Sequence, residues 1–331
     1  MPFPMCIDSV KQEADKMEQY QLIRADRPKG PVIDRLTERI RTDRGEEALE
    51  YLSFPALREC GLVEHLFTTR QGGVSEGIYA TLNLSYSRGD DAQCVTENYR
   101  RVAKVLGCSI EDMVCSDQTH TTNIRRVTAA DGGKRITRPA DYHDVDGLVT
   151  NEPGVALVTF YADCVPLYFV DTKNRAIGLA HSGWRGTVSK MGACMCERMQ
   201  AEFGTEPEHL LAAIGPSICQ ACYEVSEDVA CAFADTFKGT ESLLKEIQEN
   251  GIYGENLQIV AEGRQPGKYQ LDLWLANLVI LREAGIPLQN ISVTDICTCH
   301  NPEILFSHRA SQGKRGNLGS FLMLKPDLKK N

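Results

Sequence analysis

From about residue 50 onward, short apolar runs alternate with polar or glycine-containing turns. Such runs are typical of buried strands, in which successive side chains point to opposite faces of a sheet. On this pattern we predict strands over residues 63–69, 113–117, 122–127, 146–150, 155–161, 166–171, 175–181, 210–214, 291–297 and 303–307.

Longer segments with apolar residues at helical spacing predict helices over residues 97–106, 186–203, 226–237 and 271–284. Glycine directly after a helix is a common stop signal, and it follows three of these segments, at Gly107, Gly204 and Gly285. Many strands at short spacing, with helices mainly flanking or following them, favour mixed sheets covered by helices over a doubly wound parallel sheet. The predicted fold class is therefore α/β, of the α+β type.

Residues 1–45 differ from the rest of the chain, because they are highly charged and contain few apolar residues. Within them, the spacing of Ile33, Leu36 and Ile40 predicts a short amphipathic helix. We interpret residues 1–45 as a charged extension, partly helical or disordered, and residues 46–331 as a single catalytic domain.

The composition excludes several classes of protein. A formal net charge of −9 argues against nucleic-acid binding, although the pairs Arg125-Arg126 and Lys314-Arg315 still suit a small anion. No apolar run reaches the length needed to span a bilayer, about 20 residues. The first residues lack the pattern of a secretory signal, so we expect a cytoplasmic protein. No glycine-rich nucleotide-binding motif follows a strand.

The chain contains 13 cysteines, whose spacing does not resemble a disulfide framework. A second, sulfur-rich metal site is one interpretation of three close pairs, Cys194/Cys196, Cys219/Cys222 and Cys297/Cys299. Closed zinc sites usually draw on C-x₂₋₄-C pairs, and only Cys219/Cys222 has that spacing. We therefore interpret the six cysteines as small buried apolar residues.

Cys164 and His181 stand at the ends of two neighbouring predicted strands. Cys164 precedes the strand over 166–171, and His181 ends the strand over 175–181, seventeen positions later (181 − 164). The polar residues 172–174 form a turn between these strands, and a hairpin of this kind brings its two ends together. His120, at the end of another short β-like run, is the best third member, ahead of His65 and His143.

Two chemistries fit a thiolate beside an imidazole, namely a pair of metal ligands or a nucleophile with its base. A His-Cys-His set with a fourth position open is the ligand count of a catalytic zinc site. Copper could occupy the same ligands. For any one of these histidines, a half-buried core residue is the alternative interpretation.

Arginines and polar residues beside these positions indicate a substrate pocket. Arg70, Arg185 and Arg309 each lie beside a turn, and guanidinium groups that converge would bind a phosphate or carboxylate. For each of them alone, a solvated surface arginine is an equally good interpretation. Gln118 and Asp163 neighbour candidate ligands, and they either orient water or substrate or hold the ligands in place.

Several segments, in this order, resemble one protein family: TTRQGGVSEGIYATLNL, SDQTH, DGLVTNEPGVALVTFYADCVPL, GLAHSGWRGT, AAIGPSICQACYEV and FSHR…GKRGN. This YfiH-like family is described as multi-copper polyphenol oxidoreductase (laccase domain), peptidoglycan editing factor and purine nucleoside phosphorylase. The resemblance implies a four-layer α/β/β/α fold, with two mixed sheets between helices. It also implies that His120, Cys164 and His181 hold a zinc ion.

The same resemblance implies phosphorolysis of adenosine, inosine, guanosine and methylthioadenosine to the free base and ribose 1-phosphate, together with adenosine deamination. In this hypothesis Arg70, with Arg185 or Arg309, positions phosphate, and zinc assists the departing base or activates water. One alternative is a cysteine hydrolase or deamidase that uses Cys164 and His181. Another is a copper-dependent polyphenol oxidase, for which 7 histidines are few. A link to cell-wall precursor editing is compatible with each of these activities. We expect a monomer or a small homo-oligomer.

Overall fold

A computed structural model describes residues 20–26, 32–43 and 45–326 of the chain. Its first sheet contains, in spatial order, β1 (Asp34–Thr42), β2 (Gly45–Ser53), β3 (Val63–Thr68), β15 (Leu318–Leu324), β7 (Ala156–Tyr161) and β4 (Met113–Cys115). Its second sheet contains β14 (Ile291–Val293), β10 (Leu210–Ile214), β8 (Val165–Asp171), β9 (Ala176–Ser182), β6 (Gly147–Thr150) and β5 (Ile124–Arg126). Both sheets are mixed, because β4/β7, β10/β14 and β5/β6 pair in parallel and the other neighbours are antiparallel.

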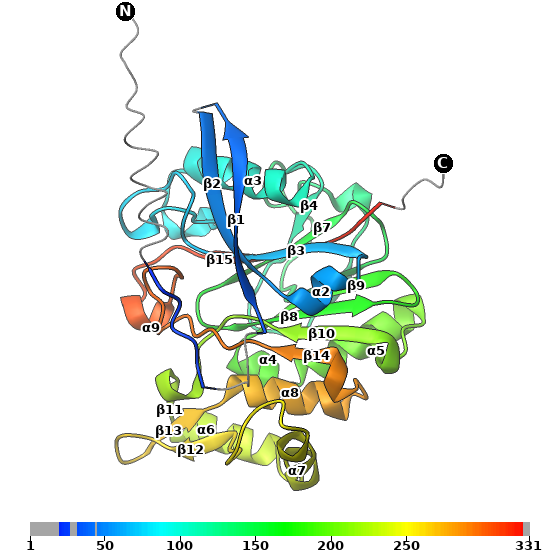
Figure 1. Ribbon diagram of the computed structural model, residues 1–331, viewed down its shortest axis with the longest axis vertical. Helices are drawn as coiled ribbons and strands as arrows, with labels where there is room; N and C mark the ends of the chain where they lie inside the picture. The colour runs from blue at the N-terminus through cyan, green and yellow to red at the C-terminus, as the bar shows by residue number, and fades with distance from the viewer. Residues whose placement is uncertain (1–19, 27–31, 44, 327–331) are drawn as a thin grey trace, which may run out of the picture.

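The two sheets pack face to face between helices, which confirms the predicted four-layer α/β/β/α fold (Figure 1). Buried residues of both sheets, such as Leu157 and Ile177, form the core between them. The helix α3 (Ala92–Leu106) covers the outer face of the first sheet. The helices α4 (Trp184–Val188), α5 (Met191–Phe203) and α8 (Leu273–Glu283) cover the outer face of the second.

A small third sheet lies beyond α8, next to α6 (Glu227–Thr236) and α7 (Glu241–Asn250) (Figure 1). It consists of β11 (Glu224–Ser226), β13 (Lys268–Leu271) and β12 (Val260–Glu262). The remaining helices are short: α2 (Pro55–Glu59), α9 (His308–Ser311) and the 3₁₀ helices η1 (Gly77–Tyr79), η2 (Tyr86–Arg88), η3 (Ala129–Asp131), η4 (Pro207–His209), η5 (Gln220–Cys222) and η6 (Leu288–Asn290).

Several boundaries follow from local chemistry. The side chain of Asp91 accepts a hydrogen bond from Gln93 N at the start of α3, and the predicted stop residues Gly107 and Gly204 end α3 and α5 in the left-handed conformation. The single helix predicted over 186–203 is instead two helices. Lys190 lies between them with φ of 56°, a conformation that interrupts α-helical hydrogen bonding.

Two predicted elements are wrong, and the prediction lacks the strands β2, β11, β12, β13 and β15. The helix predicted around Ile33, Leu36 and Ile40 is the strand β1, which pairs along its whole length with β2. Residues 303–307 form a turn and a loop instead of a strand. The central strand β15 was not predicted, although it joins β3 to β7 in the first sheet. Residues 1–19 of the predicted extension lie outside the described residues.

The predicted hairpin that carries the candidate site is confirmed. Strands β8 and β9 pair antiparallel, with Pro166 opposite His181 and Val165 opposite Ser182. Cys164 therefore lies directly before β8, and His181 lies close to the end of β9. Among the described residues, no helix combines the length and apolar character needed to cross a membrane.

Candidate active site

His120, Cys164 and His181 converge at the end of the β8–β9 hairpin. One nitrogen of each imidazole and the sulfur of Cys164 all lie within 4.8 Å of one another. The rings of the two histidines are nearly perpendicular, with centroids 4.9 Å apart. His181 is buried, Cys164 is half-buried and His120 is exposed, so the group opens to solvent on the His120 side. The structure thus brings together the three residues that the sequence indicates.

The buried carboxylate of Asp146 holds both histidines in place. It accepts a hydrogen bond from Nδ1 of His181 at 2.8 Å and others from the backbone N–H groups of Thr119, His120 and Thr121 at 3.0–3.1 Å. Burial would raise the pKa of Asp146, but the hydrogen bond and charge of His181 keep it below its ordinary value. With Nδ1 donating to this carboxylate, Nε2 of His181 is the nitrogen left to bind a metal.

Gly183, directly after β9, lies against the ligand group. A Cβ atom built on it would stand 2.9 Å from Cδ2 of His120 and 3.1 Å from the sulfur of Cys164. His120 and Asp163, the residue before Cys164, both have a positive φ, of 68° and 92° respectively. Such a backbone conformation is uncommon for residues other than glycine. Uncommon backbone conformations cluster at functional sites, and here both of them set the direction of a candidate ligand.

Cys164 and His181 shift one another's protonation. Burial alone would raise the pKa of the Cys164 thiol, but the charge of His181 and hydrogen bonds from both histidines lower it. Burial alone would lower the pKa of His181, but the charge of Cys164 and the hydrogen bond to Asp146 raise it. The pair therefore favours a thiolate beside an imidazolium. A thiolate is the form of cysteine that binds metals and attacks electrophiles.

The donor set fits a zinc ion. One thiolate and two imidazoles are ligands that zinc prefers, and a catalytic zinc site keeps its fourth position for substrate or water. The three residues line a cavity of about 810 Å³, so the fourth position would face a space large enough for a small molecule. Asp146 supplies the carboxylate that commonly orients a zinc-binding histidine.

Three arginines line this cavity, and none of them is one of the substrate-binding candidates Arg70, Arg185 and Arg309. They are Arg88, Arg135 and Arg315. Arg135 pairs with Asp117 at 2.7 Å, whereas no ion pair of Arg88 or Arg315 is found among the described residues. Arg315 is only 8% exposed. Burial and the charge of Arg88 lower the pKa of Arg315 to about 10, and the charges of Asp163 and Cys164 offset this only in part.

The arginines chosen from the sequence lie outside the lining of the cavity. Arg70 donates to the carbonyl groups of Ala80 and Pro302 and lies over the ring of Phe306. Arg309 donates through its guanidinium to the carbonyl groups of residues 222 and 224. Arg185 stacks on the ring of Trp184. The signal that pointed to the cavity was the basic pair Lys314-Arg315, whose arginine lines it.

The side chains of Gln118 and Asp163 both form hydrogen bonds within the protein. Gln118 lines the cavity, but its side-chain amide donates to the carbonyl of Phe160 at 2.8 Å and accepts from the N–H of Phe160 at 2.6 Å. The carboxylate of Asp163 accepts from Thr298 Oγ1 and from the backbone N–H of Arg309, each at 2.7 Å. These contacts favour the interpretation that both residues position their neighbours, His120 and Cys164.

The two weaker histidine candidates lie elsewhere. Nε2 of His65 accepts a hydrogen bond from the N–H of Phe54 at 2.9 Å in a buried position, where burial lowers the pKa of His65 to about 3. His143 is exposed and lies 3.3 Å from a carboxylate oxygen of Asp117. Among the described residues, no candidate metal site contains more than two histidines, and the one that contains two is the group of His120, Cys164 and His181. Several copper centres would need more.

Fold and site together define an α/β/β/α protein with a candidate metal site at the end of a strand hairpin. The sequence model of the family described as multi-copper polyphenol oxidoreductase laccase matches residues 64–325. The chain belongs to this family.

Named relatives describe what other members do. "Purine nucleoside phosphorylase YlmD" of Bacillus subtilis is 34% identical over 78% of this chain and 87% of its own length. "Adenosine deaminase RL5" of an unknown prokaryotic organism is 32% identical over 75% of this chain and 88% of its own length. The crystal structure of YlmD from Geobacillus stearothermophilus superimposes with a TM-score of 0.73 at 33% identity, covering 83% of this chain and 96% of that one.

Proposed function

We propose that this protein is a zinc-dependent purine nucleoside phosphorylase that acts on adenosine, inosine, guanosine and methylthioadenosine. The observation that carries the proposal is the convergence of His120, Cys164 and His181 on a cavity that is also lined by Arg88, Arg135 and Arg315. The relative named purine nucleoside phosphorylase YlmD supports the same activity. His120, Cys164 and His181 would hold the zinc ion, which supplies Lewis-acid chemistry toward the substrate and water.

Phosphate fits the side of the cavity that carries Arg88 and Arg315. The Nε atom of Arg315 is buried and has no hydrogen-bond partner among the described residues, so an anion oxygen would satisfy it. Nη1 of Arg315 donates to the carbonyl of Gly316 and to the side-chain oxygen of Asn317, which fixes the direction of the guanidinium group. A dianion here would also remove the repulsion between the two guanidinium groups.

The purine base would lie against Tyr86 and Phe160, whose aromatic rings line the same cavity. An oxygen of phosphate then attacks the anomeric carbon of the ribose as the bond from that carbon to the base breaks. The base leaves with the bonding electron pair and takes up a proton, and the sugar leaves as ribose 1-phosphate. Arg88 and Arg315 hold the nucleophile, while Asp146 keeps His181 in the orientation that completes the site.

Product analysis on the full chain tests this proposal. Each of the four nucleosides is incubated with zinc-loaded protein, with and without phosphate, and base and sugar products are quantified. We expect free base and the matching sugar 1-phosphate in equal amounts, and only when phosphate is present. The sugar product is ribose 1-phosphate, or 5-methylthioribose 1-phosphate from methylthioadenosine. Base released at the same rate without phosphate, or no base released from any of the four nucleosides, would contradict the proposal.

Adenosine deamination is a second candidate activity, favoured by the relative named adenosine deaminase RL5. Deamination consumes water instead of phosphate, so inosine should accumulate from adenosine when phosphate is omitted. A mixture with phosphate should give hypoxanthine together with adenine. The absence of inosine in both mixtures would remove this second activity and leave phosphorolysis unaffected.

A cysteine hydrolase or deamidase is the competing enzyme class, because the Cys164 thiolate lies beside a possible base, His181. His120 favours the metal interpretation, since a nucleophile and its base do not need a second imidazole in contact with the sulfur. Treatment with a strong chelator should abolish phosphorolysis, and added zinc should restore it. Activity that survives chelation but not thiol alkylation would favour the cysteine nucleophile.

A further inference from the structure

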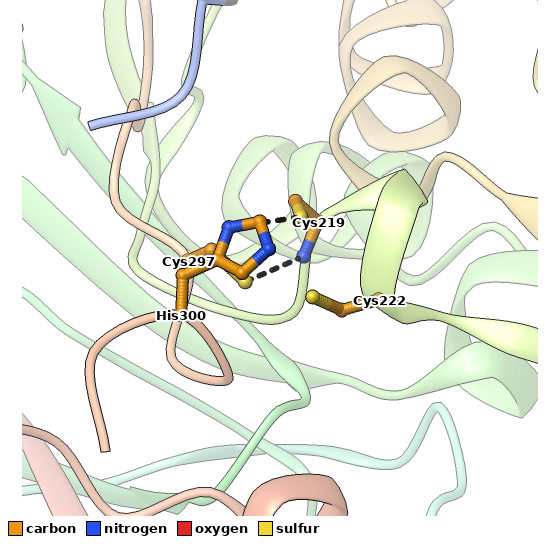
Figure 2. Close-up of side chains that lie close together, drawn as sticks. All are labelled: Cys219, Cys222, Cys297 and His300. Carbon is orange, nitrogen blue, oxygen red and sulfur yellow. Dashed lines mark hydrogen bonds between the residues drawn. The ribbon is translucent and has the colours of Figure 1, made fainter. Parts of the chain in front are cut away.

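A second group of metal-ligating side chains lies apart from the active site, in loops next to the small third sheet. It consists of Cys219, Cys222, Cys297 and His300, whose three sulfurs and one imidazole nitrogen all lie within 4.8 Å of one another. Figure 2 shows the sulfurs of the three cysteines and the ring of His300 facing a common space. Cys219 and Cys297 are buried, Cys222 is half-buried and His300 is exposed.

The fold brings these residues together through two neighbouring parallel strands. Cys219 and Cys222 follow β10, and Cys297 and His300 follow β14, so both pairs leave the same edge of the second sheet. The two loops are joined by a bridge between Ser217 and Cys297 and by a hydrogen bond from Thr298 N to the carbonyl of Ser217 at 3.1 Å. Each loop supplies two candidate ligands separated by two residues.

The distances are close to those of a tetrahedral zinc site. Zinc binds sulfur at about 2.3 Å and imidazole nitrogen at about 2.0–2.1 Å, which places neighbouring ligand atoms about 3.5–3.8 Å apart. Here the sulfur of Cys219 lies 3.9 Å from Nδ1 of His300. The loop that contains Cys219 is also joined to Cys297, because the N–H of Cys219 donates a hydrogen bond to the sulfur of Cys297 at 3.3 Å. Small side-chain rotations would therefore suffice to close the tetrahedron.

We propose that Cys219, Cys222, Cys297 and His300 bind a structural zinc ion. Four protein ligands leave no position for substrate, which distinguishes this site from the three-ligand group at Cys164. Three thiolates also select zinc over hard cations such as magnesium or calcium. The sequence pattern favours buried apolar residues at Cys219 and Cys222 and pairs Cys297 with Cys299, whereas His300 lies with the other three candidate ligands here.

The proposed zinc ion would restrict the motion of two loops that hold Asp163, the residue before Cys164. The N–H of Ile218 donates to the carbonyl of Asp163 at 3.0 Å, and Thr298 donates to the Asp163 carboxylate at 2.7 Å. Both donors neighbour the proposed ligands, and Asp163 directly precedes Cys164 in the chain. The zinc would thus cross-link the two loops that hold Asp163 in its left-handed conformation.

Metal analysis of full-length variants tests the proposal. Wild-type protein, purified without added metal, should contain about two zinc ions per chain, one at each site. The variants Cys222→Ser and His300→Gln change residues that are not fully buried, so both should fold, and each should lose about one zinc ion per chain. Cys164→Ser should lose the other ion and keep this one. Cys231→Ser, an exposed cysteine on α6, is the matched control and should keep both.

Cobalt substitution provides a readout that does not depend on enzyme activity. In the Cys164→Ser variant, bound cobalt should give the strong thiolate charge-transfer absorption of a three-sulfur site, and Cys222→Ser in the same background should weaken it. Zinc content unchanged by both Cys222→Ser and His300→Gln would overturn the proposal. So would a disulfide between Cys219 and Cys222 in zinc-free native protein, detected as two missing thiols that reappear on reduction.

Discussion

Asp146 accepts a hydrogen bond from Nδ1 of His181 at 2.8 Å, and its backbone carbonyl accepts from the N–H of the same histidine at 2.8 Å. This double contact between the residue that precedes β6 and a residue of β9 fixes the ring of His181, which lines the cavity. Asp146 also accepts from the N–H of His120 at 3.1 Å. One buried carboxylate therefore sets the positions of two candidate metal ligands that are 61 positions apart (181 − 120).

Replacement of Asp146 by asparagine should weaken zinc binding at the active site by roughly 10–100-fold, because loss of such a supporting carboxylate has effects of that size. Competition with a chromophoric chelator measures the affinity. Asp144→Asn is the matched control, since Asp144 is exposed and asparagine tolerates its left-handed backbone. Equal zinc affinity in the two variants would contradict the role given to Asp146.

A methyl group at Gly183 should disturb the ligands directly. The Cβ atom of a Gly183→Ala variant would stand 2.9 Å from Cδ2 of His120 and 3.1 Å from the Cys164 sulfur, so one of them must move. The backbone of Gly183 is extended and accepts any residue, so the fold should persist. We expect a loss of zinc affinity and of nucleoside cleavage of at least about 10-fold, since a shift of one ångström in a site has such effects.

The control for Gly183→Ala is Gly186→Ala, three residues along the same segment. Its Cβ atom would meet nothing closer than 3.6 Å, which is an ordinary contact. This variant should keep wild-type zinc affinity, and alanine should stabilise α4 slightly. If Gly183→Ala binds zinc as well as Gly186→Ala does, the ligands are not where the structure places them.

Arg315→Gln should raise the KM for phosphate by about 10–100-fold, because a hydrogen bond to a charged group contributes about 1.5–3 kcal/mol. The KM for the nucleoside should change much less. Steady-state kinetics with varied phosphate measures the effect. Arg264→Gln is the control, because Arg264 lies between β12 and β13 and does not line the cavity. An equal rise in both KM values would contradict a phosphate site at Arg315.

His65 should make the protein less stable as the pH falls. Burial lowers the pKa of folded His65 from 6.5 to about 3, so between these pH values the unfolded chain binds a proton that the folded chain does not. The free energy of unfolding should therefore decrease by about 1.4 kcal/mol for each pH unit of acidification in this interval. His65→Gln should remove this part of the slope. His143→Gln, at an exposed histidine, should leave the slope unchanged.

Local pairings could be predicted from the sequence, and long-range ones could not. Cys164 and His181 belong to one hairpin with a short turn, so strand periodicity alone brings them together. Arg88 and Arg315 are 227 positions apart (315 − 88), and only the closed fold shows that both face one cavity. The candidate ligand pairs Cys219/Cys222 and Cys297/His300 likewise meet because β10 and β14 are parallel neighbours, which no local pattern reveals.

The wrong prediction at residues 33–40 has a similar cause. Leu36 and Ile40 are four positions apart, a spacing that places two residues on one face of a helix and also on one face of a strand. Pairing with β2 decides in favour of the strand, because it satisfies the backbone hydrogen bonds of β1 along nine residues. The central strand β15 is buried at every position, and such runs show no alternation that distinguishes strand from helix.

The most direct test of the central claim is a zinc titration of metal-free wild-type protein, followed in parallel by release of hypoxanthine from inosine in the presence of phosphate. The account predicts that the rate is near zero without zinc and rises in proportion to zinc bound at His120, Cys164 and His181. It also predicts that Cys164→Ser shows neither this binding nor this rate. Full phosphorolysis by the metal-free protein, or by Cys164→Ser, would contradict it.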